Sequence, residues 1–421
     1  MKERLKAPEL RFEGFTDDWE ERKLGDFIKI SREQEVKKVD LHEEKIGYYV
    51  LAMRTFDFEG YIDYSKPYWI NNFESADDDL FLNRKEFAII DADMDASLPK
   101  IGKVLLNATN NKFLLAAHIR KIKVDVQVDS IFAYALMRTT ELVERLKLEA
   151  NGSISKRLLD KNVYKQKVYL PIHLEEQQQI GEFFWTLEET ITLHQRKLDL
   201  LKEQKKGFLQ KMFPKNGAKV PELRFAGFAD DWEQRKLSDV ANHRGGTAIE
   251  KYFDKDGVYK VISIGSYGLN SQYVDQNIRA ISNEITDGRV VNSGELTMVL
   301  NDKTANGTII GRTLLVEKDN EYVINQRTEI ISPKENFDSS FAYTILNGPF
   351  REKVKRIVQG GTQIYVNYPA VSNLNLELPE IEEQQKIGSF FKQLDDTIAL
   401  HQRKLDLLKE QKKGFLQKMF V

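Results

Sequence analysis

The sequence contains no cysteine among its 421 residues. This absence excludes disulfide bonds, thiol nucleophiles and cysteine-ligated metal sites, and it is consistent with a reducing compartment. The chain also lacks a run approaching the roughly eighteen apolar residues of a membrane-spanning helix, and its first residues, MKERLKAPEL, lack the apolar segment of a signal peptide. We therefore expect a cytoplasmic protein without membrane contacts.

Histidine and net charge are also scarce. The six histidines show neither HxxxH nor HExxH spacing, so no metal site is predicted. The net charge is −2, and this lack of a basic excess counts by itself against nucleic-acid binding. With 421 residues, 41% hydrophobic and 30% charged, the chain is expected to fold into two or more globular domains.

Internal repeats organise the chain. The segment PELRFEGFTDDWEERKLGD at 8–26 returns at 221–239 with fifteen of nineteen residues identical. A longer segment at 175–213 returns at 382–420, and its last twenty residues, HQRKLDLLKEQKKGFLQKMF, are the same in both copies. Two copies of one frame therefore enclose two different inserts.

Both long repeats predict helices that pack along one stripe. Their apolar residues recur in steps of four and three, as in a coiled-coil seam, and Pro171 and Pro214 bracket the first copy. His194 and His401 lie on the same stripe and are interpreted as packing residues. The predicted packing positions are Ile180, Phe184, Leu187, Ile191, Leu198 and Leu201 in the first copy and Ile387, Phe391, Leu394, Ile398, Leu405 and Leu408 in the second.

Charge predicts how the two helices run. The first half of each helix is acidic, and the last turns are rich in lysine and arginine. An antiparallel pair sets acidic halves against basic halves, whereas a parallel pair places like charges together at both ends. We therefore expect an antiparallel pair. The basic ends are either solvated faces or contacts to DNA phosphates, and the sequence leaves both interpretations open.

The inserts, residues 27–170 and 240–378, share almost no sequence identity but repeat one order of elements. Short β-rich runs such as GYYVLAM and VYKVISI are separated by turn residues. Each insert then ends with a helical stretch, a glycine-containing loop and a short strand. We predict a mixed α/β (α+β) fold with two globular domains, separated by two long antiparallel coiled-coil helices in a pseudo-twofold duplication.

Neither insert carries a recognisable catalytic motif. There is no P-loop, no GxSxG, no NPPY-type methylase tetrad and no paired-acid nuclease pattern, which disfavours a stand-alone nuclease or methylase. The loops do supply Lys, Arg, Asn, Gln, Thr and Tyr, the residue types that contact base edges and phosphates. DNA binding is one interpretation. The alternative is a non-enzymatic scaffold whose duplicated helices dock protein partners.

The repeated series PELRF-x-GF-x-DDWE-x-RKL, variable insert, glycine-containing loop, proline and EEQQ-x-IG-x-FF resembles the specificity subunit (HsdS) of type I restriction-modification systems. The resemblance covers nearly the whole chain. It implies target-recognition domains at 1–170 and 214–378 and conserved spacer helices at 171–213 and 379–421. Each domain is then expected to read one half of a bipartite, asymmetric site in double-stranded DNA, with the helices setting the spacer.

The resemblance also implies partners. The helices dock two methylase (modification) subunits, which carry the S-adenosylmethionine chemistry of adenine methylation, and restriction subunits that use ATP and Mg join this core. This chain then has no catalytic residue and binds no cofactor itself. For each glycine of the expected DNA-binding loops a plain turn is the alternative. The expected loop residues are Gly152, Ser153, Ser155, Lys156 and Arg157 in the first domain and Gly245, Gly246, Thr247, Gly360, Gly361, Thr362 and Gln363 in the second.

Overall fold

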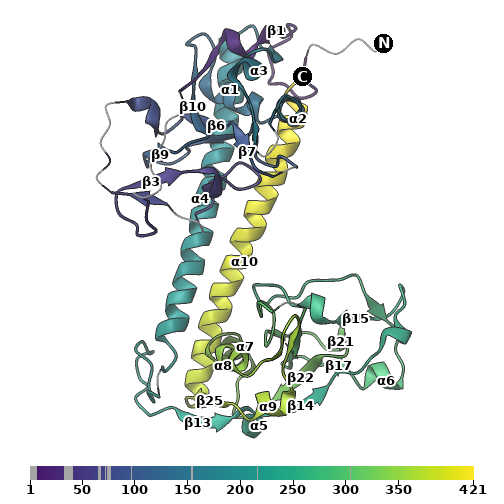
Figure 1. Cartoon of the computed structure of the whole chain (residues 1–421). Coiled ribbons are helices and arrows are strands. Elements are labelled where there is room, and N and C mark those ends of the chain that lie inside the picture. Colours follow the sequence, from purple (N-terminus) through teal and green to yellow (C-terminus); the bar gives the residue numbers. More distant parts are fainter. Residues whose placement is uncertain are drawn as a thin grey trace. The chain divides into compact units, whose positions relative to one another are not determined.

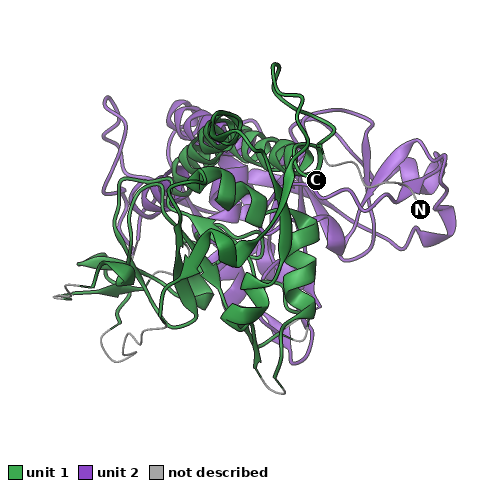
Figure 2. Cartoon of the chain, turned by 90° about the horizontal axis from the view of Figure 1, so that it is seen from above, with its two compact units in different colours: residues 1–199, 400–421 green, residues 200–399 purple. Residues whose placement is uncertain are grey.

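The computed structural model describes residues 7–32, 41–64, 68–71, 73, 77–95, 97–152, 155–215, 217–303 and 305–421. The chain forms two compact units (Figure 2): unit 1 consists of Met1–Asp199 and Leu400–Val421, and unit 2 of Leu200–Ala399. Two long helices, α4 (Leu174–Lys211) and α10 (Ile381–Lys418), each contribute to both units (Figure 1). The units thus divide the chain by its contacts, and the predicted domain boundaries near 170, 213 and 378 stay a prediction.

Unit 1 contains two four-stranded sheets. Its elements are β1 (Glu20–Lys23), β2 (Ile28–Ile30), β3 (Tyr48–Leu51), β4 (Trp69–Ile70), β5 (Phe81–Leu82), β6 (Phe87–Ile90), β7 (Ala92–Asp93), β8 (Val104–Leu106), β9 (Phe113–Leu115), β10 (Ile119–Val124), α1 (Ser130–Met137), α2 (Thr140–Leu148), β11 (Lys156–Arg157), α3 (Asp160–Tyr164) and β12 (Lys167–Leu170). One sheet has the antiparallel order β2-β10-β6-β8. The other has the order β4-β3-β9-β5, in which β3 and β9 are parallel.

Unit 2 repeats this topology. Its elements are β13 (Glu233–Lys236), α5 (Leu237–Val240), β14 (Ala241–Gly245), β15 (Tyr259–Ile262), β16 (Arg279–Ala280), α6 (Glu284–Asp287), β17 (Val290–Val291), β18 (Leu296–Val299), β19 (Asn301–Asp302), β20 (Thr313–Leu315), β21 (Tyr322–Ile324), β22 (Thr328–Pro333), α7 (Ser339–Asn347), α8 (Pro349–Arg356), β23 (Gln359–Gly360), β24 (Ile364–Tyr365), α9 (Tyr368–Ser372) and β25 (Asn375–Leu378). The sheets have the orders β14-β22-β18-β20 and β16-β15-β21-β17, with β15 parallel to β21.

The two inserts therefore share a fold despite their different sequences. Strands β6, with the sequence FAII, and β18, with LTMV, hold the same place in their sheets, and all four residues of each are buried. Both strands need only a short continuous apolar run, which many sequences satisfy. The predicted mixed α/β fold with a duplicated arrangement is confirmed.

In unit 1 the start of α4 packs against the end of α10 in an antiparallel pair. The rings of Phe183 and Phe415 lie 4.8 Å apart in an edge-on contact, and Glu188 forms a fully buried ion pair with Lys412. Glu188 follows Phe183 along α4, whereas its partner Lys412 precedes Phe415 along α10, so the helices run in opposite directions, as predicted.

Unit 2 contains the same contacts with the roles of the helices exchanged. Phe208 of α4 meets Phe390 of α10 at 5.0 Å, and Lys205 Nζ lies 2.5 Å from Asp395 Oδ1. His194 and His401 are 207 residues apart in the sequence. The same sequence offset relates each residue of a unit 1 contact to the corresponding residue of the unit 2 contact. Of the predicted packing residues, Ile180, Phe184, Ile191, Leu198, Leu201, Ile387, Phe391 and Leu405 are buried, and Leu187, Leu394, Ile398 and Leu408 are partly buried.

His194 and His401 face each other in unit 1, with their Nδ1 atoms 2.9 Å apart. Two imidazoles can share such a contact only if one nitrogen donates its proton and the other accepts with a lone pair. At least one ring of the pair is therefore neutral. Burial and the neighbouring charges of His194, Lys404 and Lys197 lower the pKa of His401.

Arginines of the repeated PELRF segment clamp the start of each long helix. Arg11 donates from Nε and Nη2 to the two carboxylate oxygens of Glu176 at 2.6 and 2.8 Å. Arg224 makes the same fork to Glu383 at 2.7 and 2.8 Å. Both glutamates are buried, and a bidentate guanidinium pair is the arrangement that best compensates a buried carboxylate. The repeated motifs thus fix how each insert sits on its helix pair.

The EEQQ-x-IG motif holds the insert from the helix side. Gln177 accepts from the backbone N–H of Asp129, which caps α1, and donates to the carbonyl of Pro171. Gly181 follows one turn later, where a Cβ atom would lie 2.2 Å from the capping carboxylate. The glycine is therefore required by the close approach of α1 to α4. The counterparts in unit 2 are Gln384, Asp338 and Gly388.

Candidate nucleic-acid interface

Each insert carries a short hairpin near its end, at residues 151–157 in unit 1 and 359–365 in unit 2. Gly152 and Gly360 hold the same place in the two hairpins and have φ angles of +138° and +101°. A Cβ atom at either glycine would lie 2.1 or 2.2 Å from the carbonyl oxygen three residues further on. These two positions need glycine for the turn itself.

The hairpins pair with equivalent strands. β11 pairs with β7 in unit 1, and β24 pairs with β19 in unit 2. Asp93 is the last residue of β7, and its side chain accepts a hydrogen bond from the backbone N–H of Lys100 at 2.9 Å. Asp302 is the last residue of β19, and its side chain accepts from the backbone N–H of Ile309 at 2.8 Å. These bonds hold a second loop beside each hairpin.

A residue with left-handed backbone completes the edge in each unit. His118 and Arg327 both have φ +68° and directly precede β10 and β22. Their carbonyls accept hydrogen bonds from the N–H groups of Asp91 and Leu300, at 3.1 and 2.9 Å. Asp91 lies between β6 and β7 in the sequence, and Leu300 lies between β18 and β19. We call this edge the hairpin surface. It comprises residues 91–95, 118, 151–152 and 155–157 in unit 1, and residues 300–303, 327 and 359–365 in unit 2.

The remaining predicted loop joins the hairpin surface of unit 2. Gly246 donates its N–H to the Thr328 carbonyl at 2.8 Å, next to Arg327, and its Cβ would lie 2.0 Å from the Asn325 carbonyl oxygen. Thr247 bridges to Asn325. The structure thus brings 245–247 and 359–363 to one edge, although more than a hundred residues separate them in the sequence.

Equivalent positions of the two hairpin surfaces carry different side chains. Register places Arg157 where unit 2 has Tyr365, opposite Ala92 and Asn301 respectively. The left-handed position is a histidine in unit 1 and an arginine in unit 2. One backbone arrangement therefore presents two chemically distinct faces.

The electrostatics of the two surfaces differ as well. In unit 1 the buried carboxylate of Asp91 lies 3.2 Å from His118 Nδ1 and 3.3 Å from Arg120 Nη1. Arg120 also makes a two-pronged contact to Asp160, at 2.5 and 2.9 Å. In unit 2 the position of Asp91 is occupied by Leu300, so the guanidinium of Arg327 has no acidic counterpart at that site.

The predicted loop residues that the structure describes all lie on the hairpin surface or directly beside it, and most are exposed. Ser153 lies outside the described residues. The exposed ones are Gly152, Arg157, Gly245, Gly360, Gly361, Thr362 and Gln363, and the partly buried ones are Ser155, Lys156, Gly246 and Thr247. Their part in DNA binding stays a prediction.

Sequence reasoning missed His118, Arg327, Asp93, Asp302 and Tyr365. The two aspartates had a usable signal, because each follows a buried strand at the same step, in AIIDAD and MVLND. Arg327 has no such signal, because arginine is not among the residues enriched in left-handed backbone, and the enrichment of histidine does not single out His118 among six histidines.

The described residues contain neither a candidate metal site nor a candidate membrane span. Within them, no three His, Asp or Glu side chains gather as a potential metal-ligand group. Nor does any helix in the described part of the chain have the length and apolar character needed to cross a membrane.

The fold and the hairpin surfaces define a protein with two structurally equivalent binding domains that present different side chains. Residues 16–203 and 229–410 match the family described as the type I restriction modification DNA specificity domain, and the chain belongs to this family. The resemblance inferred from the repeated motifs is thereby confirmed. The chain is a type I restriction-modification specificity subunit, which recognises DNA sequence.

The chain is similar to known specificity subunits. The MjaVIII type I restriction enzyme specificity subunit of Methanocaldococcus jannaschii is 24% identical over 413 residues, which are 95% of this chain and 91% of the relative. The HindI specificity subunit of Haemophilus influenzae is 25% identical over 197 residues, 45% of this chain and 41% of the relative. The crystal structure of a type I S subunit from M. genitalium shares the fold, with a TM-score of 0.67, 12% identity and 99% coverage of both chains.

Proposed function

We propose that each recognition domain reads one half of a bipartite, asymmetric DNA site through its hairpin surface. The observation that supports the proposal is that equivalent strand pairings in the two domains present different side chains. Arg157 offers the forked donor that suits guanine, and Gln363 offers the donor and acceptor that suit adenine. An identical arrangement in both domains presents each surface to DNA in the same way, so the different side chains select different half-sites.

The experiment replaces one hairpin at a time. Arg157→Gln should relax or change the first half-site only, and Gln363→Ala the second half-site only, so each variant is the control for the other. The variants are assembled with their methylase subunits, and methylated positions are mapped across a genome at single-molecule resolution. A change in both half-sites from one substitution, or in neither from both, contradicts the assignment.

We further propose that the long helices set the spacing between half-sites. Each helix is unbroken over 38 residues and supplies a packing face to both units, which supports a fixed spacer. Deleting one heptad from each helix shortens the path by about 10 Å at 1.5 Å per residue, or about three base pairs at 3.4 Å. Methylation mapping of this double deletion should show a preferred spacer about three base pairs shorter. An unchanged spacer rules out the ruler.

The duplicated helices are also proposed to dock two methylase subunits and, through them, the restriction subunits. Two equivalent helix faces suit two copies of one partner. S-adenosylmethionine, ATP and Mg then belong to the partners, and this chain acts in recognition without a catalytic site of its own. If the assembled complex fails to bind DNA in a salt-dependent manner while still binding methylase, the scaffold interpretation replaces the proposal.

A further inference from the structure

A basic pocket of about 260 Å³ lies in unit 2, between the end of α4 and the insert. Three lysines of α4 reach it, together with one arginine from the loop before β20, and one acid lines it. The charged residues are Lys202, Lys205, Lys206, Arg312 and Asp395. For a chain with a net charge of −2, this is a marked local excess of positive charge.

Most of this charge is not neutralised by the protein. Lys205 is paired with Asp395 at 2.5 Å. Lys202 and Lys206 have no ion-pair partner among the described residues, and Arg312 donates only to neutral oxygens, the Thr308 carbonyl and the Ser271 hydroxyl, both at 2.9 Å. Burial lowers the pKa of Arg312.

A second arginine behind the pocket adds to the positive potential. Arg351 is buried and donates to the carbonyls of Ile310, Gly307 and Thr308 at 2.8 to 3.0 Å. Burial and the nearby charge of Arg312 lower its pKa to about 10. Glu352 and Asp302 offset part of this charge, and the two guanidinium groups, which repel each other, still favour an anion at the mouth of the pocket.

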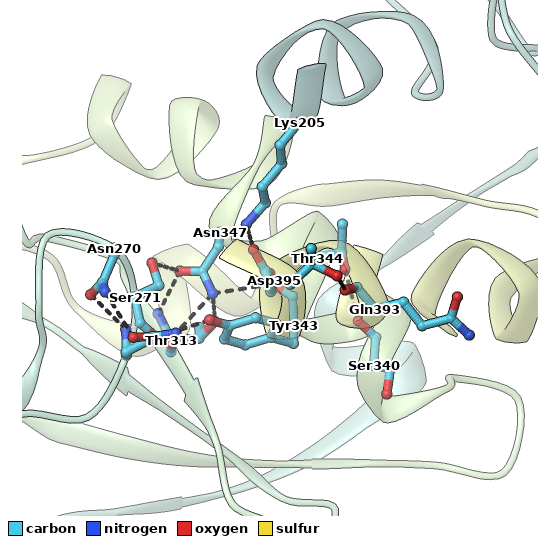
Figure 3. A network of polar contacts seen from close by, with 12 residues as sticks. Lys205, Asn270, Ser271, Thr313, Ser340, Tyr343, Thr344, Asn347, Gln393 and Asp395 are labelled. Atoms are coloured by element: carbon cyan, nitrogen blue, oxygen red, sulfur yellow. Dashed lines mark hydrogen bonds and ion pairs between the residues drawn. The ribbon is translucent and has the colours of Figure 1, made fainter. Parts of the chain in front are cut away.

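The neutral wall of the pocket is held in place by a hydrogen-bond network (Figure 3). Ser271 donates to Asn347 at 2.8 Å, and Tyr343 donates to the Ser271 carbonyl at 2.9 Å. Asn347 is fixed in turn by Thr313, from which it accepts at 2.9 Å. Lys205 and Asp395 close the opposite side in the same view. The donors around the pocket are therefore preorganised rather than freely rotating.

Unit 1 provides an internal comparison. The repeat places Lys409 and Lys412 where unit 2 has Lys202 and Lys205, and they line a corresponding pocket of about 340 Å³. There Lys409 pairs with Glu59 at 2.5 Å and Lys412 with buried Glu188. The turn that carries Glu59 is closed by the bridge Phe56–Ile62, and the matching bridge Tyr267–Tyr273 places Asn270 at the position of Glu59. The two copies therefore differ at one lysine: Lys409 is paired with an acid in unit 1, and Lys202 has no ion-pair partner among the described residues of unit 2.

We propose that the unit 2 pocket binds a phosphate group through Lys202, Lys206 and Arg312. The two ammonium groups and the guanidinium N–H groups of Arg312 beyond those that contact Thr308 and Ser271 form the donor set that phosphate oxygens take. The phosphate comes either from the DNA backbone or from free phosphate in solution. The backbone source rests on the proposed DNA-reading function, and contact there positions unit 2 on the duplex without reading its sequence.

The test compares Lys202→Gln with its matched control Lys409→Gln, which removes the paired lysine of the same repeat. The complex with methylase subunits is titrated with its cognate duplex and with a scrambled duplex, by fluorescence anisotropy at several salt concentrations. Loss of one backbone contact weakens binding to both duplexes about eightfold at 0.1 M salt and lowers the salt slope by about 0.9. Lys409→Gln should stay within about twofold, because its lysine is already paired.

A second arm titrates inorganic phosphate into the full chain without DNA, by calorimetry, with Arg312→Gln as a further variant. Phosphate binding that Lys202→Gln and Arg312→Gln abolish, without an effect on DNA, assigns the site to free phosphate. Equal effects of Lys202→Gln and Lys409→Gln on DNA, together with no phosphate binding, overturn the proposal. If the unmodified complex does not prefer its cognate duplex, the proposed reading function fails, whereas the phosphate arm still tests the pocket.

Discussion

The same glycine-to-alanine substitution should have opposite effects at two positions of α4. Gly207 is a helical glycine with open space around it, and alanine there stabilises the protein by about 0.4 to 1 kcal/mol through helix propensity and a less flexible unfolded chain. At Gly181 a Cβ meets the Asp129 carboxylate at 2.2 Å and the Phe132 backbone nitrogen at 3.2 Å. Displacing that cap costs about 1 kcal/mol, and crowding costs about 1 to 3 kcal/mol.

After subtracting the propensity gain, Gly181→Ala should destabilise unit 1 by about 1 to 3 kcal/mol. Urea denaturation followed by tryptophan fluorescence measures both variants, because Trp185 lies in the unit 1 core one turn after Gly181 and Trp232 lies in the core of unit 2, to which Gly207 belongs. Gly388→Ala in α10 should cost more, since the Phe341 backbone nitrogen lies at 2.6 Å and backbone yields less than a side chain. If Gly181→Ala stabilises the protein as Gly207→Ala does, α1 does not rest on α4 as described.

Two further predictions concern charges on the helix pair. Because the pKa of His401 is lowered, the folded state resists protonation of this ring. The contribution of His401 to the free energy of unfolding is therefore present above its unfolded pKa of about 6.5 and is lost as the pH falls below that value. The denaturation midpoint of the parent protein should drop as the pH falls below about 6.5, and that of His401→Leu should drop less. Lys412→Met leaves the carboxylate of Glu188 buried without its cationic partner and should lower the free energy of unfolding by about 3 to 5 kcal/mol. Lys205→Met removes one partner of a partly exposed pair and should lower it by less than about 1 kcal/mol in the same assay.

The long helices and the fold class could be predicted because their signals are local and duplicated. A seam of alternating steps, acidic starts and basic ends defines α4 and α10 to within two residues. The clamp between Arg11 and Glu176 could not be predicted in the same way. It joins residues 165 positions apart, and nothing in either motif says which glutamate of EEQQ faces the arginine.

The hairpin surface was located from the sequence through its glycine-containing loops, and its part in DNA binding stays a prediction. Gly152 and Gly360 were found because their backbone conformation requires glycine. His118 and Arg327 were missed because their left-handed backbone is imposed by strand pairing on both sides, a tertiary effect. The pairing of each hairpin with β7 or β19 is also long-range, so sequence placed the loops in the chain but not beside one another in space.

Identity between the two helix repeats does not imply identical chemistry, and the lysines show why. Lys202 and Lys409 occupy the same position of the same twenty-residue sequence. One insert supplies Glu59 to its lysine, and the other supplies Asn270 at the matching turn position. A carboxylate turns the lysine into a structural contact, and an amide leaves it as an available cation. In a protein built from a repeated frame and two different inserts, the role of a frame residue is therefore decided by the insert that packs against it.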